Sequence, residues 1–342
     1  MAVDESPLVA PEALERAAAL LRAGGLVAFP TETVYGLAAD ARNPAAVRRI
    51  FQAKGRPPDH PLIVHLSAAE DLEAWADPVP EAAWRLAEAF WPGPLTLVLP
   101  RRAGVIDELT GGQPTVALRV PNHPLALALL RRAGALAAPS ANRFGGVSPT
   151  RADHVRAELG GAVDMILDGG SCAVGLESTI ISLLDEGPRL LRPGGVVAER
   201  IEDVLGVPLP RDAGGPRAPG RLAAHYAPAT PLELLPRSEL WMRAAALMRE
   251  GLDIAVVALG QAEPEQVPSR GVAFVALPAQ ADAYGHDLYA TLRDLDARRV
   301  SRLLVESPPD DTAWLAVRDR LARAAEPSRR TRHDPPTRGS DP

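Results

Sequence analysis

The chain has 342 residues, of which 37 are Lys or Arg and 43 are Asp or Glu, so its formal charge is −6. Hydrophobic residues make up 46% and charged residues 23% of the sequence, which is typical of soluble globular proteins and excludes disorder for most of the chain. The length indicates two domains. The single cysteine, Cys172, excludes an internal disulfide and a cysteine-based zinc site.

The sequence contains no sign of membrane attachment. No uncharged apolar stretch approaches the length of a membrane span, and the N-terminus, with Asp4 and Glu5, lacks the pattern of a signal peptide. We therefore expect a cytoplasmic protein without a membrane partner. The acidic net charge also argues against non-specific binding of duplex nucleic acid, so function is expected to lie in specific sites.

The first elements in chain order alternate between helix and strand. Apolar residues at helical spacing predict a helix over 12–22 that ends at Gly24-Gly25, and a buried strand follows at 26–30. Asn43 and Pro44 indicate the start of a second helix that runs to about residue 53. Further strands are expected at 62–66, 95–99, 115–119, 163–167, 178–184 and 189–192, with helices near 80–90, 123–133 and 150–159. This alternation predicts an α/β domain with a mixed twisted sheet over residues 8–208.

The remainder of the chain predicts a linker, a smaller domain and a tail. Residues 209–231 are rich in Pro and Gly without apolar periodicity, which indicates an interdomain linker. Strands are expected at 232–235, 254–259, 272–276 and 302–306, with helices near 239–250, 282–299 and 311–325. The pattern predicts a small Rossmann-like α/β domain over 232–325. Residues 326–342 are polar and rich in Pro and Arg, so we expect a tail without regular structure.

Common catalytic motifs are absent from the sequence. It contains neither of the glycine-rich phosphate loops GxxxxGK[ST] and GxGxxG. It also lacks the GxSxG nucleophile elbow and the HExxH zinc helix. We interpret His60 and His65 as unrelated side chains and not as a metal-binding pair.

Polar residues follow several predicted strands at points where α/β sheets bind ligands. Thr31, Glu32, Thr33 and Tyr35 follow the strand at 26–30. These side chains could hold a ligand, or the threonines could simply accept hydrogen bonds from turn amides.

A proline-rich loop carries two cations. Lys54 and Arg56 stand two residues apart in KGRPPDHPL (54–62), where three prolines restrict the backbone. An ammonium and a planar guanidinium held in this way suit phosphate or carboxylate. The alternative is a solvated basic loop.

The segment APSANRFGGVSP (138–149) has the features of a ligand-binding turn. Ser140 and Asn142 would point to one side of an extended chain, and Gly145-Gly146 allows a close backbone approach. We expect Ser148 to cap the next helix, whose N-terminus can receive an anion. A plain capped turn is the alternative.

Two arginines end apolar strands, Arg119 in VALRVP and Arg192 in LLRPGG. Each alone favours a structural ion pair, because a buried charge needs a partner. Together with Lys54 and Arg56 they predict a pocket for a polyanion.

These motifs resemble those of the YrdC-like family, the L-threonylcarbamoyladenylate synthases. The resemblance covers about residues 10–205 in order. It rests on PTETVYGL (30–37), KGRPPDHPL (54–62), WPGPLTLVL (91–99), VALRVPNHP (116–124), PSAN (139–142), FGGVSPT (144–150), GLESTII (175–181) and LLRPGG (190–195). The whole chain is similar to the long form of the family, in which a linker ending in HYAP joins a smaller Rossmann-like domain, and His225-Tyr226-Ala227-Pro228 stands in that place.

The resemblance implies an enzyme, a nucleotidyltransferase that converts L-threonine, bicarbonate and ATP into threonylcarbamoyl-AMP and pyrophosphate. Mg²⁺ would accompany ATP. A downstream transferase would use the product to form N6-threonylcarbamoyladenosine next to the anticodon of tRNA, which makes that transferase and tRNA the implied partners.

The resemblance also implies roles for individual residues. The ATP phosphates and the reacting carboxylate would be held by Lys54, Arg56, Ser140 and Asn142. The rest of the nucleotide site would consist of His60, Thr115, Ser148, Arg192 and Tyr226. The threonine site would consist of Thr33, His65, Arg119 and Ser178, with the Arg119 guanidinium on the substrate carboxylate.

This chain departs from the family pattern at two places. His60 stands where the family commonly has Asn, and an imidazole can still donate a hydrogen bond there, with a dependence on pH. In the linker, the usual Lys-containing run is replaced by Arg221-Leu222-Ala223-Ala224, so a lysine contact from the linker is not expected.

Two other functions fit parts of the sequence. A non-catalytic RNA-binding or ribosome-assembly module could use the same cations for phosphodiesters, although aromatic residues for base stacking make up only 4% of the chain. The carbamoyltransferase of hydrogenase maturation also contains a YrdC-like domain. That larger protein carries zinc-binding CxxC motifs, which a chain with one cysteine cannot form.

Overall fold

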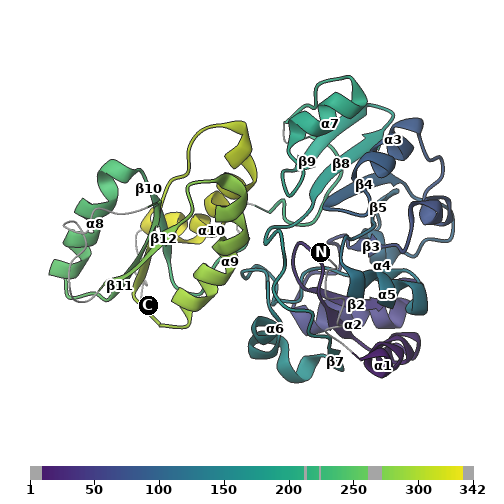
Figure 1. Ribbon diagram of the computed structural model, residues 1–342, viewed down its shortest axis with the longest axis horizontal. Coiled ribbons are helices and arrows are strands. Elements are labelled where there is room, and N and C mark those ends of the chain that lie inside the picture. The colour runs from purple at the N-terminus through teal and green to yellow at the C-terminus, as the bar shows by residue number, and fades with distance from the viewer. Residues whose placement is uncertain (1–9, 212–213, 223–224, 261–271, 334–342) are drawn as a thin grey trace, which may run out of the picture. The chain divides into compact units, whose positions relative to one another are not determined.

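The computed structural model describes residues 10–211, 214–222, 225–260 and 272–333. These residues form two compact units (Figure 1). The first contains the chain up to Phe144 together with Ser148–Arg221, and the second contains Gly145–Val147 and the chain from Leu222 onward. The boundary between the units at Arg221 and Leu222 lies within the segment predicted as a linker. The second unit also includes Gly145–Val147, which lie in the middle of the predicted first domain.

The helices and strands of the first unit agree closely with the expected positions. Its α-helices are α1 (Pro11–Arg22), α2 (Pro44–Lys54), α3 (Glu81–Phe90), α4 (Asp107–Thr110), α5 (Pro124–Ala133), α6 (Ala152–Leu159) and α7 (Ala198–Leu205). Its 3₁₀ helices are η1 (Ala69–Ala74) and η2 (Gly160–Ala162). Its strands are β1 (Val27–Phe29), β2 (Gly36–Asp40), β3 (Ile63–His65), β4 (Leu95–Pro100), β5 (Thr115–Arg119), β6 (Leu136–Ala137), β7 (Met165–Ile166), β8 (Thr179–Leu184) and β9 (Gly187–Arg192).

The strands of the first unit form one mixed sheet. Their order is β7-β1-β2-β6-β3-β5-β4-β8-β9. Pairs β1–β7, β3–β5 and β4–β8 are parallel, and the others are antiparallel. Helices α1 and α5 lie side by side on the sheet, and so do α3 and α7 (Figure 1). The mixed α/β sheet expected for this domain is therefore present.

Local sequence explains where the helices begin and end. The Asn43 side chain accepts hydrogen bonds from the amides of Ala45 and Ala46 and caps α2, and Gly55 ends the helix with a φ of 62°. Helix α1 buries Leu14, Ala17, Ala18 and Leu21 in a core shared with β1 and α5. The predicted amphipathic face is the face that the structure buries.

Several elements of the first unit were not expected from the sequence, namely β2, α4, α7 and the two 3₁₀ helices. Residues 29–40 were predicted as a strand end followed by a ligand-binding segment, but Gly36–Asp40 forms β2, which returns antiparallel to β1. Gly36 suits the close packing of the two strands, because a Cβ there would lie only 3.0 Å from the Phe29 ring. Helix α7 follows β9 within the predicted domain.

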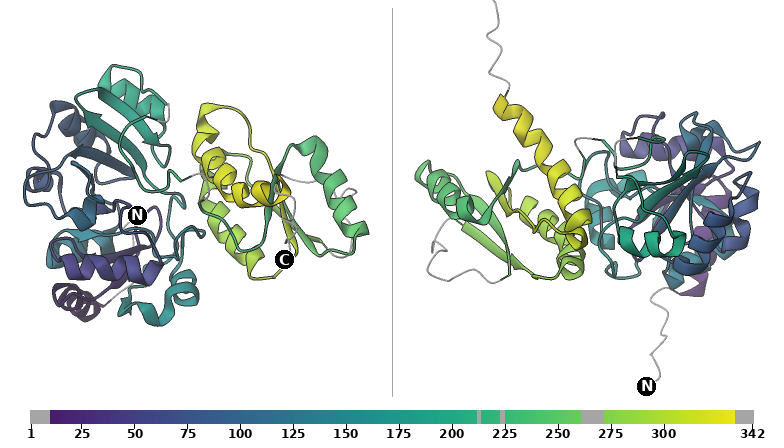
Figure 2. Two further views of the ribbon diagram at one scale, coloured as in Figure 1. Left: turned by 180° about the vertical axis from the view of Figure 1, so that it is seen from behind. Right: turned by 90° about the horizontal axis from the view of Figure 1, so that it is seen from above.

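The second unit is a parallel α/β domain, as predicted. Its strands β10 (Leu232–Leu235), β11 (Ile254–Leu259), β12 (Val272–Leu277) and β13 (Arg302–Glu306) follow the order β10-β13-β11-β12 and are all parallel. Helix α8 (Arg237–Arg249) covers one face of this sheet, and α9 (Ala281–Asp296) and α10 (Leu315–His333) cover the other (Figures 1 and 2).

The structure tests the predicted tail over part of its length, and it also bears on the prediction that no segment spans a membrane. A tail without regular structure was expected from Glu326. This prediction is wrong for residues 326–333, which continue helix α10 to His333. Residues 334–342 lie outside the described residues. In the part of the chain that the structure describes, no helix combines the length and apolarity needed to cross a membrane.

Candidate active site

The sheet of the first unit brings together side chains that are far apart in sequence. The parallel pair β3–β5 places His65 directly opposite Arg119. Arg119 then reaches the turn between β1 and β2, where its Nη1 donates to the Thr33 hydroxyl at 2.9 Å. Three of the four residues predicted for threonine therefore lie together, and all three are buried.

Ser178, the fourth predicted threonine residue, is held at the start of β8. Its neighbour Thr179 donates its amide to the Pro94 carbonyl, and Arg119 donates Nε to the carbonyl of Gly93 in the same turn. Gly194 packs so closely on this backbone that a Cβ would lie 2.3 Å from the Glu177 carbonyl oxygen. The glycine-containing turn after β9 thus fixes the backbone that carries Ser178.

Arg119 forms a buried ion pair, as its place at the end of an apolar strand favours, with a partner that the sequence did not identify. Its Nη2 lies 2.7 Å from Oε1 of Glu32, and both side chains are at most 7% exposed. The two atoms are in contact without the alignment of a hydrogen bond. Because an isolated buried charge is very costly, this carboxylate stabilises the guanidinium in place. The Arg119 side chain predicted to hold the substrate carboxylate therefore already has a carboxylate neighbour.

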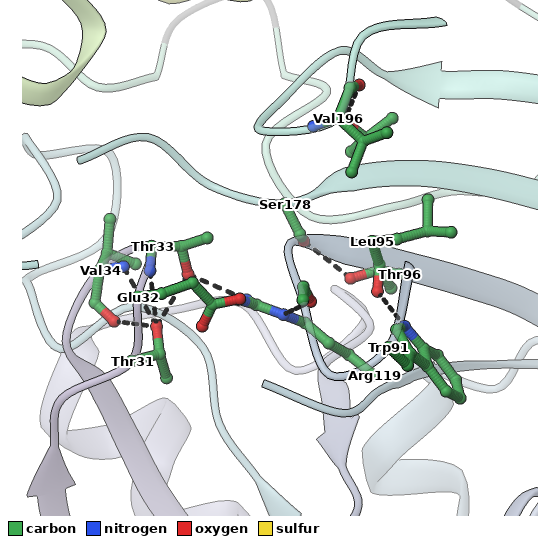
Figure 3. Close-up of polar contacts among 12 residues, drawn as sticks. Thr31, Glu32, Thr33, Val34, Trp91, Leu95, Thr96, Arg119, Ser178 and Val196 are labelled. Atoms are coloured by element: carbon green, nitrogen blue, oxygen red, sulfur yellow. Dashed lines mark hydrogen bonds and ion pairs between the residues drawn. The ribbon is translucent and has the colours of Figure 1, made fainter. Parts of the chain in front are cut away.

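The Ser178 hydroxyl contacts two other polar side chains, of which Figure 3 shows Thr96. It is 2.7 Å from the hydroxyl of Thr96 on β4, and Nη2 of Arg192 donates to it at 3.2 Å. The Arg192 guanidinium also donates to the Ser178 carbonyl, from Nη2 at 2.8 Å and from Nε at 3.2 Å. Arg192, predicted for the nucleotide, thus directly contacts a residue predicted for threonine.

Lys54 connects two of the predicted motifs. Its ammonium donates to the backbone carbonyls of Ser140 and Asn142, and its own carbonyl accepts from the amide of Phe144 at 2.8 Å. Lys54 is 3% exposed. It is also the one lysine in the sequence, and the other 36 basic residues counted with it are arginines. The structure therefore brings Lys54, Ser140 and Asn142 together around an ammonium group.

Arg56 and His60 meet at an aromatic ring. The Arg56 guanidinium lies 5.6 Å from the centre of the Phe144 ring, and the His60 ring lies edge-on to the same ring at 5.2 Å. Arg56 also donates to the Pro61 carbonyl at 2.9 Å. Gly111 packs against the Asp59 carbonyl, where a Cβ would lie 2.2 Å from the oxygen. The loop is thus rigid and its arginine buried, unlike the solvated basic loop considered as an alternative.

The role predicted for Ser148 as a helix cap is wrong. Helix α6 begins after Arg151, which makes no side-chain cap. The Ser148 hydroxyl instead donates to Oε1 of Glu177 at 2.6 Å, and Ser148 is completely buried three residues before the N-cap of α6. An anion site at the N-terminus of α6 therefore loses its predicted cap.

The two remaining residues predicted for the nucleotide lie in different units. Thr115 is buried at the start of β5 in the first unit. Tyr226 belongs to the second unit, where its ring stacks on Tyr289 at 5.9 Å and lies 4.9 Å from the Arg320 guanidinium. Its contact with a nucleotide stays a prediction.

Burial determines the charge state of the two histidines. Burial, and then the positive charge of Arg119, lower the pKa of His65 to about 3. Burial and the charge of Arg56 lower the pKa of His60 from its usual range. His65 is therefore a neutral imidazole at neutral pH, able to donate from one ring nitrogen and accept at the other.

The lowered pKa of His65 predicts a loss of stability in acid. In the unfolded chain His65 takes up a proton near pH 6.5, whereas in the folded protein it stays neutral down to about pH 3, so stability falls as the pH drops below 6.5. Between pH 7 and pH 5 this residue should cost about 2 kcal/mol. Urea unfolding at both pH values should show that His65→Asn loses less free energy of unfolding than the unmodified protein. An equal loss in the two proteins would mean that the pKa of His65 is the same in the folded and unfolded states.

Three residues of the site were not found from the sequence. Thr96, Phe144 and Glu177 each contact a residue that was predicted for the site. Glu32 was named from the sequence as a possible ligand-binding residue, but its contact with Arg119 was not predicted. Glu177 carried a usable signal, because a carboxylate within a buried segment requires a partner.

Comparison with known proteins places both units in one family. The family model described as "Telomere recombination" matches residues 19–194, and the model described as "Threonylcarbamoyl-AMP synthase, C-terminal domain" matches residues 196–326. The chain is 44% identical over 328 residues to the threonylcarbamoyl-AMP synthase of Bacillus subtilis, covering 91% of this chain and 92% of that protein. It is 41% identical over 322 residues to that of Pyrococcus abyssi, covering 90% and 93%.

A solved structure agrees with these matches. The crystal structure of P. abyssi Sua5 complexed with L-threonine is similar with a TM-score of 0.85 and 39% identity. The similarity covers 93% of this chain and 95% of that one. The likeness therefore extends over both units.

Proposed function

Because the chain belongs to the threonylcarbamoyl-AMP synthase family, we propose that it converts L-threonine, bicarbonate and ATP into threonylcarbamoyl-AMP and pyrophosphate. The observation that carries the proposal is the Lys54 ammonium, buried between the carbonyls of Ser140 and Asn142 with the buried Arg56 nearby in the chain. Buried cations on rigid segments suit the phosphates of a nucleotide, since little reorganisation is needed when charge develops.

The proposed chemistry has two steps. The neutral amine of threonine attacks the carbon of bicarbonate, and water leaves with formation of a carbamate. A carbamate oxygen then attacks the α-phosphorus of ATP, the bond from that phosphorus to the bridging oxygen breaks, and pyrophosphate leaves. Both steps depend on holding the reactants in line and on neutralising phosphate charge, so the protein acts through positioning and electrostatics.

The proposed roles belong to residues of the first unit, except for Tyr226, which lies in the second unit and enters through the family resemblance alone. Lys54, Arg56, Ser140 and Asn142 hold the phosphates and the reacting carboxylate. His60, Thr115, Ser148, Arg192 and Tyr226 complete the nucleotide site. Thr33, His65, Arg119 and Ser178 hold threonine, and the contacts of Arg119 with Thr33 and of Arg192 with Ser178 support a shared site.

We propose that ATP is used as its Mg²⁺ complex. The residues that the structure describes hold no group of three or more His, Cys, Asp or Glu side chains placed to bind a metal ion. The predicted phosphate residues are cations and neutral donors, which fit phosphate oxygens and not a metal. In the proposed complex the ion would be bound mostly by ATP oxygens and water, and it would lower the charge of the leaving pyrophosphate.

The chemical lability of the product implies a second enzyme that uses it. Threonylcarbamoyl-AMP is a mixed anhydride that water hydrolyses, so a second enzyme must consume it promptly. We propose a cytoplasmic transferase that passes the threonylcarbamoyl group to an adenosine of tRNA.

Discrimination of threonine against serine, which lacks one methyl group, should be worth about 1–3 kcal/mol.

The test is pyrophosphate release from ATP and Mg²⁺ with threonine and bicarbonate omitted singly and together. Release that requires both supports the synthase. ATP binding without release would contradict it and favour a nucleotide-sensing or RNA-binding role.

A further inference from the structure

His60 lies in a rigid loop with an imidazole that is available to a ligand. The loop over residues 54–62 contains three prolines, and the His60 amide donates to the Pro57 carbonyl at 3.3 Å. The half-buried ring packs edge-on against Phe144, with 5.2 Å between the ring centres. Among the residues that the structure describes, none forms a hydrogen bond with a ring nitrogen of His60. Both nitrogens can therefore serve a ligand.

Two arginines lie beside this ring and hold more positive charge there than the nearby carboxylate balances. The buried Arg56 guanidinium lies 5.6 Å from the centre of the Phe144 ring that the imidazole also contacts. Arg217 lies 3.1 Å from the Asp59 carboxylate and donates to the Gly111 carbonyl at 2.9 Å. Two cations thus stand against one anion.

The position of Arg217 is fixed by its backbone as well as by its side chain. Its amide donates to Oε1 of Gln113 at 2.8 Å, and Nε2 of Gln113 donates to its carbonyl at 3.1 Å. The guanidinium is therefore held near the loop even though its side chain is 55% exposed.

The charge of His60 depends on these neighbours. Burial, and then the charge of Arg56, lower the pKa of His60 from its usual range. Asp59 acts in the opposite direction, and Arg217 lowers the pKa further. The imidazole is therefore mostly neutral at neutral pH in the protein without nucleotide.

We infer that His60 takes up a proton when the phosphates of ATP bind, so that the nucleotide and the proton each strengthen the binding of the other. The inference rests on the proposed function, which places ATP phosphates at Lys54, Arg56 and His60. A phosphate beside the ring supplies the negative charge that the two arginines outweigh, and an imidazolium donates from both nitrogens. Because the coupling is reciprocal, ATP affinity must rise as the pH falls through the range in which His60 titrates. An asparagine at this position, which is common in the family, has no such proton.

Calorimetry of Mg²⁺·ATP binding measures this proton. Threonine and bicarbonate are omitted to prevent turnover, and each titration is repeated in two buffers of different ionisation enthalpy between about pH 5.5 and 7.5. The difference between the two heats gives the protons taken up per ATP bound. The variants are His60→Asn, His60→Gln and Asp59→Asn. His286→Asn is the matched control, since it removes a histidine elsewhere whose side chain is 44% exposed.

A phosphate beside the ring should raise the pKa of His60 by about one unit. The unmodified protein should then take up about 0.5 proton more than His60→Asn at the maximum, and its ATP affinity should gain about tenfold more on acidification. His60→Gln should behave like His60→Asn, and His286→Asn like the unmodified protein. Asp59→Asn should move the maximum to lower pH, because Asp59 favours the charged imidazole. Protons bound by ATP itself cancel in the difference between the proteins.

Equal proton uptake by the unmodified protein and both His60 variants would overturn the inference. A purely structural role of His60 would change ATP affinity at every pH and leave proton uptake as it is. Absence of ATP binding by the unmodified protein would refute the proposed function as well. Pyrophosphate release that requires threonine and bicarbonate, together with equal proton uptake in all variants, would refute this inference alone.

Discussion

Lys54→Ala should reduce the rate of pyrophosphate release at least about 100-fold, the loss seen when one preorganised hydrogen-bond donor is removed from a transition state. It should also lower the free energy of unfolding by about 1–3 kcal/mol, because the carbonyls of Ser140 and Asn142 lose their donor. Activity is measured under conditions where circular dichroism shows the variant folded.

A matched control lies on the same helix. Arg48 has a side chain that is 55% exposed, and Arg48→Ala should keep its activity. Lys54→Arg should fail to restore activity, because a planar guanidinium is larger than the ammonium that fits between the two carbonyls. A folded Lys54→Ala protein with unchanged turnover would remove Lys54 from the site.

Lys54 also provides a chemical readout, since it is the one lysine in the chain. An amine-selective reagent can modify only Lys54 and the N-terminal amine, and peptide mass spectrometry separates the two. ATP with Mg²⁺ should slow modification of Lys54 and leave that of the N-terminus unchanged.

Glu32→Gln should have the second large effect. It leaves the buried Arg119 guanidinium without its carboxylate and should cost about 3–5 kcal/mol of the free energy of unfolding. Glu15→Gln is the matched control, because Glu15 contacts Arg132 at the same 2.7 Å but is 61% exposed. An exposed pair of this kind is worth less than about 1 kcal/mol, so equal losses in the two variants would contradict the account of Glu32.

A double variant separates the structural role of the pair from its role in binding. Glu32→Leu combined with Arg119→Met replaces the ion pair by apolar side chains and should regain much of the stability that Glu32→Gln loses. It should not bind threonine, because the proposed site then lacks its guanidinium. Threonine binding by the stable double variant would show that the pair is purely structural.

The sequence predicted nearly all of the fold because the long apolar periods were clear. The four strands and the first two helices of the second unit appear within a few residues of their expected positions, as the buried runs at 254–259 and 302–306 illustrate, whereas α10 continues past its expected end to His333. Strand β2 was missed because Gly36–Asp40 consists of residues that disfavour strands and is held only by pairing with β1 and β6. Tertiary pairing determines its structure.

The candidate site was predicted by residue type but not by contact. The sequence indicated Arg119 and Thr33 separately, and only the β3–β5 register and the turn after β1 bring them to 2.9 Å. Ser148 was misassigned because a Ser-Pro pair before a helix is a common cap, and its buried partner Glu177 is 29 residues away in the chain. Such long-range partners cannot be derived from local patterns.

The central claim is that a carbon from bicarbonate enters an adenylate of threonine. The protein is incubated with L-threonine, ATP, Mg²⁺ and ¹³C-bicarbonate, and the quenched mixture is analysed by mass spectrometry. We expect a threonylcarbamoyl-AMP ion one mass unit heavier than with ordinary bicarbonate, together with one pyrophosphate for each adduct. A threonine–AMP adduct whose mass does not change with the label, or ADP and phosphate as the only products, would contradict the account.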